Sequence, residues 1–122
     1  MAIVVERTFT IERGAAAEFE RLSREGIWPY MEARGCKILG LFTIAHGGPT
    51  DELILLTAYA SFAHWENTRL DLPPPDGSTQ EVAELARAAQ EASSARNKLT
   101  VRSETRALRL TTKWVDLGVR EG

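Results

Sequence analysis

The chain has 122 residues, of which 43% are hydrophobic and 26% charged, and its formal net charge is −2. A chain of this length can bury one hydrophobic core, since two independent domains usually need about 100 residues each. Its 15 basic and 17 acidic residues are interspersed, so it does not have the basic surface that nucleic acid binding requires. No apolar run approaches the ~20 residues that span a bilayer, and the N-terminus does not resemble a secretion signal. We therefore expect a cytoplasmic protein with neither nucleic acid nor membrane as a partner.

Cysteine and histidine usage argues against a metal site. The lone Cys36 has no partner for an intramolecular disulfide and no nearby Cys/His set, so we expect a small buried residue. The two histidines, His46 and His64, do not have the spacing of metal-binding motifs. The sequence predicts no metal and no cofactor, and His64 is the only reasonable axial ligand if haem were bound.

The first third of the chain predicts a strand followed by a helix. Apolar residues alternate with other residues from Ile3 to Ile11, which is the period of a β-strand. From Ala15 to about Gly35 they recur every three or four positions, as on one face of a helix. Pro29 removes an amide donor inside this segment, so the helix should kink or restart near residues 27–28.

Two β-rich runs follow, at residues 37–45 and 52–60, with the turn-forming residues 46–51 between them. They predict an antiparallel hairpin. Both runs are apolar at neighbouring positions, whereas a sheet with one solvated face would show clean alternation. Helices can cover only one face in a domain this small. We therefore expect the other face to form a homodimer with a second copy of the chain.

The last part predicts two helices and a strand. Ser61 suits the N-cap of a short helix over residues 62–70, and residues 71–78 form a proline-rich connection. Thr79 begins a long helix whose narrow buried stripe is Val82, Leu85, Ala89, Ala92 and Leu99. Alternation from Thr105 to Val115 predicts the final strand. Residues 1–115 would form one domain, followed by a mobile tail at 116–122.

This order of elements predicts the fold class. Strand, helix, strand, strand, helix, helix, strand is the ferredoxin-like α+β arrangement, in which helices lie on one face of a four-stranded antiparallel sheet. With the expected dimer it becomes a dimeric α/β barrel.

Four segments resemble the NIPSNAP family in order and spacing: Glu6 to Gly14, Gly35 to Phe42, Thr57 to Phe62, and Ser103 to Arg109. The position two before Arg7, often acidic in that family, is Val5 here. The resemblance implies a homodimer whose two sheets face each other, with a cavity between sheet and helices in each subunit. The wider superfamily contains monooxygenases, isomerases, polyketide cyclases and proteins of no known activity, so the fold leaves the reaction open.

Three side chains could carry chemistry. Arg7 shares strand parity with Val5 and Phe9, so it lies on an apolar face, where a charge is costly unless it is paired or used. It could form an ion pair with a terminal or partner-subunit acid, or it could bind a carboxylate or enolate. His64 begins the short helix just after Tyr59. Its imidazole could act as general base while the tyrosine hydroxyl donates to an oxyanion, provided that both reach one cavity.

Two functions remain open at this stage. The first is a cofactor-free isomerase, cyclase or oxygenase-like enzyme that acts by proton transfer on an apolar, oxygen-bearing small molecule. The second is a non-catalytic module of the NIPSNAP type that binds a small molecule or supports assembly. In either case we expect aromatic side chains to line the pocket, namely Trp65, Tyr30, Trp28, Phe42 and Phe9.

Overall fold

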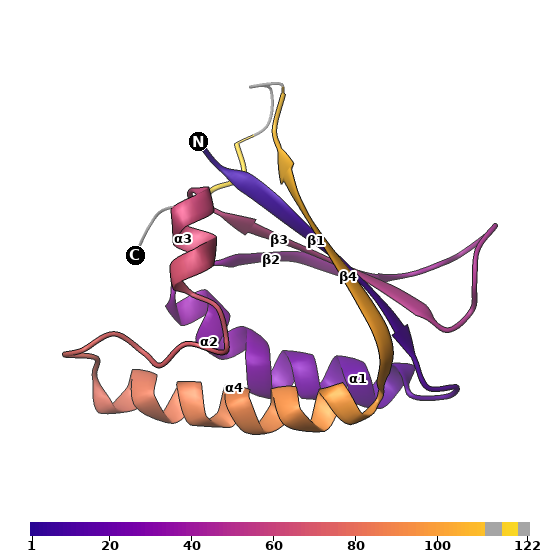
Figure 1. Cartoon of the computed structure of the whole chain (residues 1–122), viewed down its shortest axis with the longest axis horizontal. Helices are drawn as coiled ribbons and strands as arrows, with labels where there is room; N and C mark the ends of the chain where they lie inside the picture. Colours follow the sequence, from indigo (N-terminus) through magenta and orange to yellow (C-terminus); the bar gives the residue numbers. More distant parts are fainter. Residues whose placement is uncertain (112–115, 120–122) are drawn as a thin grey trace.

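The computed structural model describes residues 1–111 and 116–119. Four strands form one antiparallel sheet in the order β2-β3-β1-β4. Their bounds are Ile3–Ile11 for β1, Lys37–Thr43 for β2, Glu52–Tyr59 for β3 and Thr100–Arg109 for β4. The helices lie on one side of this sheet (Figure 1). The predicted ferredoxin-like α+β fold is therefore confirmed.

Four α-helices and one π-helical segment occur in the described part of the chain. The bounds are Ala16–Leu22 for α1, Ser23–Ile27 for the π-helical segment η1, Trp28–Ala33 for α2, Phe62–Asn67 for α3 and Gln80–Lys98 for α4. Pro29 lies in the first turn of α2, where its missing amide leaves no hydrogen bond unmade. The predicted restart at Trp28 is confirmed, although the π-helical segment before it was not predicted. No helix among the described residues is long and apolar enough to cross a lipid bilayer.

Side chains cap both of these helices, at Ser61 as predicted and at Thr79, one residue before α4 begins. The Ser61 hydroxyl accepts a hydrogen bond from the His64 amide at 3.0 Å, and the Thr79 hydroxyl accepts one from the Val82 amide at 3.2 Å. Each bond satisfies an amide that has no partner within the helix. The caps therefore set where α3 and α4 begin.

The final strand differs from its prediction. β4 begins at Thr100 and ends at Arg109, and it pairs with β1 from Ile11↔Thr100 to Ile3↔Arg109. Its first half has charged side chains and an exposed Val101, so alternation alone did not indicate it. Backbone pairing with β1 needs no apolar side chains at a sheet edge. Residues 112–115 of the predicted strand lie outside the described part.

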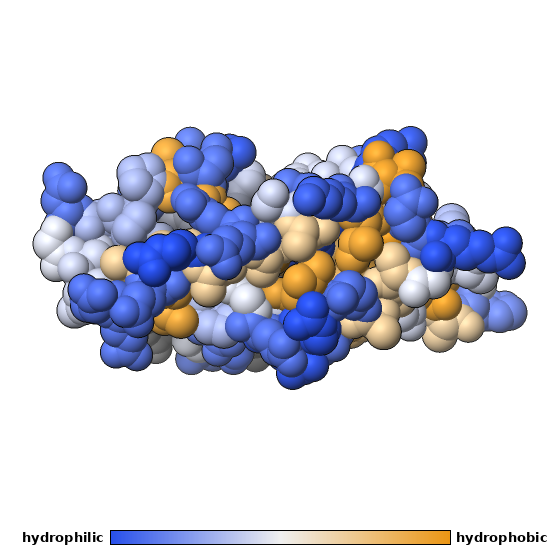
Figure 2. All heavy atoms as spheres, turned by 90° about the horizontal axis from the view of Figure 1, so that it is seen from below, coloured by the Kyte–Doolittle hydropathy of each residue, from blue (hydrophilic) through white to orange (hydrophobic). Residues whose placement is uncertain are grey.

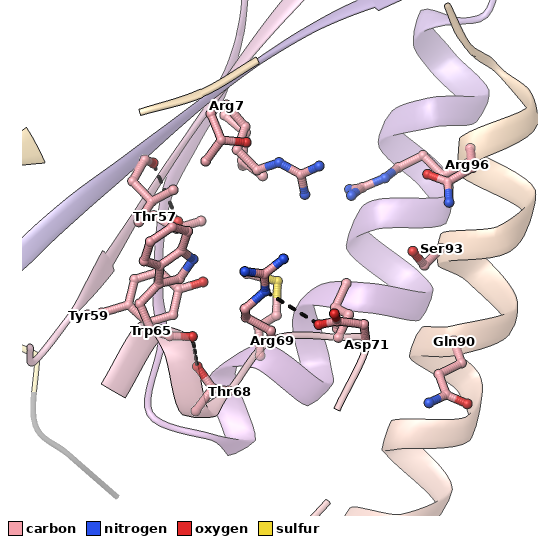
Figure 3. Close-up of a pocket in the computed structure, with 16 residues that line it drawn as sticks. Arg7, Thr57, Tyr59, Trp65, Thr68, Arg69, Asp71, Gln90, Ser93 and Arg96 are labelled. Carbon is pink, nitrogen blue, oxygen red and sulfur yellow. Dashed lines mark hydrogen bonds and ion pairs between the residues drawn. The ribbon is translucent and has the colours of Figure 1, made fainter. Parts of the chain in front are cut away.

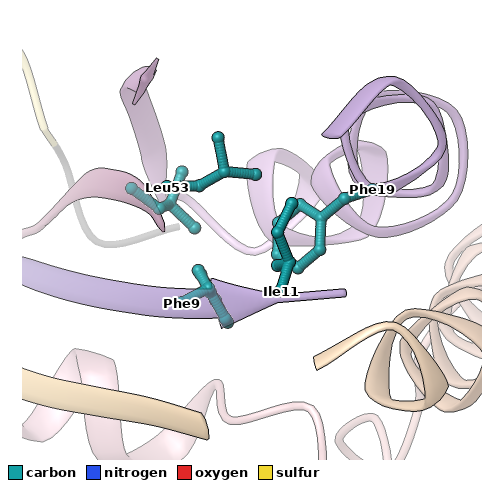
Figure 4. Close-up of a cluster of buried hydrophobic side chains, with 5 residues drawn as sticks. Phe9, Ile11, Phe19 and Leu53 are labelled. Atoms are coloured by element: carbon teal, nitrogen blue, oxygen red, sulfur yellow. The ribbon is translucent and has the colours of Figure 1, made fainter. Parts of the chain in front are cut away.

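The core lies between the sheet and the helices. Phe9, Ile11, Leu53 and Leu55 project from the sheet and pack with Phe19 of α1 (Figure 4). The Phe9 and Phe19 rings meet edge to face, with centroids 4.8 Å apart. Trp28 and Leu99 add partly buried side chains to this cluster. The opposite, solvent side of the helices is mainly hydrophilic around a central group of hydrophobic residues (Figure 2).

The segment η1 packs closely against α4. A side-chain carbon placed on Gly26 would lie 2.3 Å from the Ala92 Cβ atom. Two carbon atoms that are not bonded to each other cannot approach so closely. Arg96 of α4 donates to the Ser23 hydroxyl of η1 at 3.0 Å. A close small-residue contact and a buried hydrogen bond therefore both join η1 to α4.

The chain end also contributes to the packing. Val119 is buried, and Gly118 donates its amide to the Asp116 carboxylate at 2.8 Å. The mobility expected for residues 116–122 stays a prediction, and residues 120–122 lie outside the described part.

Candidate functional site

A cavity of about 530 Å³ lies between the sheet and the helices. Its walls come from β1, β3, β4, α2, α3, the segment after α3, and α4 (Figure 3). Met31, Leu55 and Trp65 supply apolar surface, while Thr57, Tyr59 and three arginines supply polar groups. This size and mixture are typical of small-molecule sites.

Two of the arginines face each other across the cavity. Arg7 projects from β1 and Arg96 from α4, with their guanidinium groups pointing toward one another (Figure 3). Arg96 is only 3% exposed. The Nε atoms of both side chains are buried without a hydrogen-bond partner in the described structure. The two guanidinium groups therefore leave part of their hydrogen-bonding capacity unused.

Burial acts on both arginines in the same direction. Burial, together with the smaller effect of the charge of Arg7, lowers the pKa of Arg96 to about 9. The pKa of Arg7 is also lowered, first by burial, while nearby Tyr59 opposes the shift and Arg69 adds to it. Among the described residues neither Arg7 nor Arg96 has a carboxylate within salt-bridge distance. The ligand-free cavity thus holds two charges that the surroundings stabilise poorly.

The third arginine differs from the other two. Arg69 lies in the segment after α3, half exposed, and its Nε atom is 3.4 Å from the Asp71 carboxylate. Asp71 is the one carboxylate among the described residues that line the cavity. Since this pair sits at the solvent side, most of its charge is neutralised locally and screened.

Tyr59 offers a neutral hydroxyl at the cavity wall. Burial raises the pKa of Tyr59, and the nearby Cys36 thiol contributes in the same direction. The hydroxyl therefore remains protonated at physiological pH and can donate a hydrogen bond to an oxygen of a ligand. Burial likewise raises the pKa of the Cys36 thiol to about 11, which agrees with the predicted buried, unreactive cysteine.

His64 does not reach the cavity, so the predicted convergence with Tyr59 is wrong. The ring is only 3% exposed, and its Nδ1 atom accepts a hydrogen bond from the Ala60 amide at 3.0 Å. Nε2 therefore carries the proton and donates to the Arg34 carbonyl oxygen at 2.7 Å. Neither nitrogen is left to accept a substrate proton or to bind a haem iron. His64 joins the start of α3 to the end of α2.

Four predicted aromatic residues also lie elsewhere. Trp28 packs against the core cluster, and Tyr30 is buried against α4 with its hydroxyl accepting from Arg34 at 2.8 Å. Phe42 is 47% exposed and pairs with Ile54 on the sheet face that the helices leave uncovered. Phe9 belongs to the core, although its ring supports Arg7 and Arg96 from 4.7 and 4.9 Å.

Of the predicted site residues, the structure places Arg7, Tyr59 and Trp65 in the cavity wall. It adds Arg69 and Arg96, which the sequence interpretation missed. One signal for Arg96 was available, because position 96 continues the buried stripe of α4 four residues after Ala92 and three before Leu99. A charged residue on a buried stripe indicates a site or a buried pair.

No group of three or more His, Cys, Asp or Glu side chains that could hold a metal ion occurs in residues 1–111 and 116–119. The lining instead offers guanidinium, hydroxyl and amide donors beside apolar side chains. Such a set can orient an oxygen-bearing organic molecule by hydrogen bonds.

The sheet order, the helices on one face and the cavity between the two define a ferredoxin-like α+β domain. The family model named NIPSNAP matches residues 4–113, so the chain belongs to the NIPSNAP family. The resemblance noted in the sequence is thereby confirmed.

Solved structures show the same fold. A NIPSNAP family protein from Agrobacterium tumefaciens is 25% identical, with a TM-score of 0.72 over 96% of this chain and 99% of that one. An uncharacterised NIPSNAP domain protein from Burkholderia xenovorans is 17% identical, with a TM-score of 0.70 over 93% and 99% of the two chains. A mutant of a cofactor-independent oxygenase from Streptomyces nogalater is 13% identical, with a TM-score of 0.61 over 94% and 98%. No curated protein matches the chain by sequence.

Proposed function

We propose that this protein is a small-molecule-binding domain, whose ligand has an apolar body and at least one oxygen. The observation that carries the proposal is the cavity of about 530 Å³, in which an apolar wall faces converging donors. Met31, Leu55 and Trp65 would contact the body of the ligand, and Tyr59 and Arg7 its oxygen. Binding needs no general base, which agrees with the fully bonded ring of His64.

Native mass spectrometry of the protein as purified tests this function, with a matched pair of cavity variants. Ser93 of α4 lines the cavity (Figure 3), whereas its neighbour Ser94 is exposed. Ser93→Trp should fill the cavity and remove a retained molecule, while Ser94→Trp should keep it. The same retained mass in the Ser93→Trp protein would contradict binding in this cavity.

A cofactor-independent enzyme is the second candidate, of the isomerase, cyclase or oxygenase-like kind. It is favoured by the Tyr59 hydroxyl, which burial keeps protonated beside Arg7, an arrangement that could protonate or stabilise a developing oxyanion. The oxygenase from Streptomyces nogalater shares the fold. Incubating the retained molecule with wild-type and Tyr59→Phe protein, with and without dioxygen, tests this candidate. A molecule recovered unchanged under every condition would leave binding as the function.

We also propose that the protein works as a homodimer through the sheet face opposite the helices. Paired residues share a face of a sheet, so Phe42 and Ile54 lie on that side, as does Leu56 opposite Glu6. Leu108, 38% exposed, adds to the same surface. A second copy would cover these side chains with an equivalent surface, as isologous dimers do.

A further inference from the structure

We propose that the ligand is an organic carboxylate, or an anion of the same shape, and that its charged group binds between Arg7 and Arg96. This rests on the proposed ligand-binding function. It adds the charge and chemical class of the ligand and the position of its head group.

The first support is the absence of an internal counter-charge. Arg96 is almost fully buried, its Nε atom has no partner in the described structure, and its guanidinium points into the cavity (Figure 3). The Ser23 hydroxyl, at 3.0 Å, engages only one of its donors. A buried cation normally has a carboxylate or another anion beside it.

The second support is that Arg7 and Arg96 point at one region from opposite walls. β1 lies in the sheet and α4 in the helical layer, and the guanidinium carbons of Arg7 and Arg96 lie 4.7 and 4.9 Å from the centroid of the Phe9 ring. An anion placed between them would neutralise both guanidinium charges. Guanidinium groups match carboxylate oxygens in planar, paired hydrogen bonds.

The surroundings favour an organic anion over an inorganic one. Val5 and Leu55 line the cavity beside Arg7, and Trp65 lies further along the wall. Val5 and Leu55 give no hydrogen bonds to the remaining oxygens of a free phosphate, and all three side chains can contact a hydrocarbon body. Arg69 is already paired with Asp71, so the charge left in the cavity comes from Arg7 and Arg96.

Isothermal titration calorimetry with acid and amide pairs of equal shape tests the proposal. Octanoate is compared with octanamide, and 2-naphthoate with 2-naphthamide, on the intact protein. At least one acid should bind ten times more tightly than its amide or better. Arg96→Gln and Arg7→Gln should remove this preference. Arg87→Gln, which makes the same charge change on the exposed side of α4, should keep it.

The outcomes separate the two levels of the proposal. If an amide binds as tightly as its acid, the cavity is a ligand site but the anion inference is wrong, and a carboxylate of a second copy becomes the partner of the arginines. If neither member of any pair binds, both the ligand-binding function and the inference fail. If Arg87→Gln and Arg96→Gln lose the preference for the acid to the same extent, the preference is a general charge effect and the proposed position of the head group is wrong. Retained amide binding in Arg96→Gln shows that the variant is folded.

Discussion

Arg7 of β1 and Arg96 of α4 direct their guanidinium carbons at the same ring, that of Phe9, from 4.7 and 4.9 Å. Cation–π contacts of this kind contribute about 0.5–2 kcal/mol each. That is less than the cost of removing a charge from water without an opposite charge nearby. The Phe9 ring therefore offsets part of the free-energy cost of burying the two charges. The remaining cost lowers the stability of the protein without ligand.

Replacing Arg96 by methionine should consequently raise the free energy of unfolding of the ligand-free protein, by roughly 1–4 kcal/mol. Methionine keeps most of the side-chain volume and removes the charge. Urea denaturation measures the change, with Arg87→Met as the exposed control on the same helix, expected within about 0.5 kcal/mol of wild type. An Arg96→Met protein less stable than wild type would indicate a structural role.

The gain in stability expected for Arg96→Met should depend on pH. Burial, together with the charge of Arg7, lowers the pKa of Arg96 to about 9, whereas arginine in an unfolded chain has its ordinary, higher pKa. Above about pH 9 the unfolded state then binds more protons than the folded state, so wild-type stability rises with pH. The difference in the free energy of unfolding between Arg96→Met and wild type should have its full value below that pH and should become smaller by about pH 10. A pH-independent difference would contradict this.

His64→Leu should reduce stability and leave ligand affinity unchanged. Leucine cannot replace the two hydrogen bonds of the His64 ring, so the Ala60 amide and the Arg34 carbonyl each lose their partner. A buried polar group without a partner costs about 1–3 kcal/mol. Denaturation and calorimetry on the same preparation measure the two effects. Tyr59→Phe is the contrasting variant, with weaker binding expected because its hydroxyl faces the cavity. Normal stability with lost turnover in His64→Leu would restore the general-base hypothesis.

Cys36 should react slowly in the folded protein. Burial raises the pKa of Cys36 from 9.0 to about 11, which lowers the thiolate fraction at neutral pH by about 100-fold. Alkylation by iodoacetamide, followed by mass spectrometry, should be slower than in urea-unfolded protein by at least this factor. Equal rates in the two states would show that the thiol is accessible and ionised.

Gly26→Ala should destabilise the protein by about 1–3 kcal/mol, because the added methyl meets Ala92 at 2.3 Å. Ala92→Gly should restore part of this loss when both changes are combined, although a helical glycine alone costs about 0.5–1 kcal/mol. Thermal or urea unfolding of the four proteins gives the coupling between the two positions. Strictly additive effects would contradict a direct contact.

Phe42→Glu should convert a dimer into a monomer in sedimentation velocity at micromolar protein concentration. A carboxylate at this exposed position of β2 would be buried without a partner in the proposed interface. Leu72→Glu introduces the same charge at another exposed hydrophobic residue and should leave the dimer intact. Wild-type protein that sediments as a monomer would overturn the interface.

Much of the fold could be predicted because it follows from local patterns. Alternation placed Val5, Arg7 and Phe9 on one face of β1, and the caps at Ser61 and Thr79 set the helix starts. These features depend on residues within one or two turns of each other. β4 was placed too late for the same reason, since backbone pairing at a sheet edge leaves little trace in side-chain hydrophobicity.

The site depended on packing between distant segments. His64 lost its expected role because the Arg34 carbonyl, 30 residues earlier, occupies its second nitrogen. Arg96 gained an unexpected role because α4 places it opposite β1. One of its donors is held by Ser23, which lies 73 residues away in the sequence. The sequence by itself determined the family, the fold and the face of β1 on which Arg7 lies. Only the tertiary structure decided which charges meet in the cavity, because a hydrophobic pattern specifies the face on which a side chain lies and not the groups that packing brings against it.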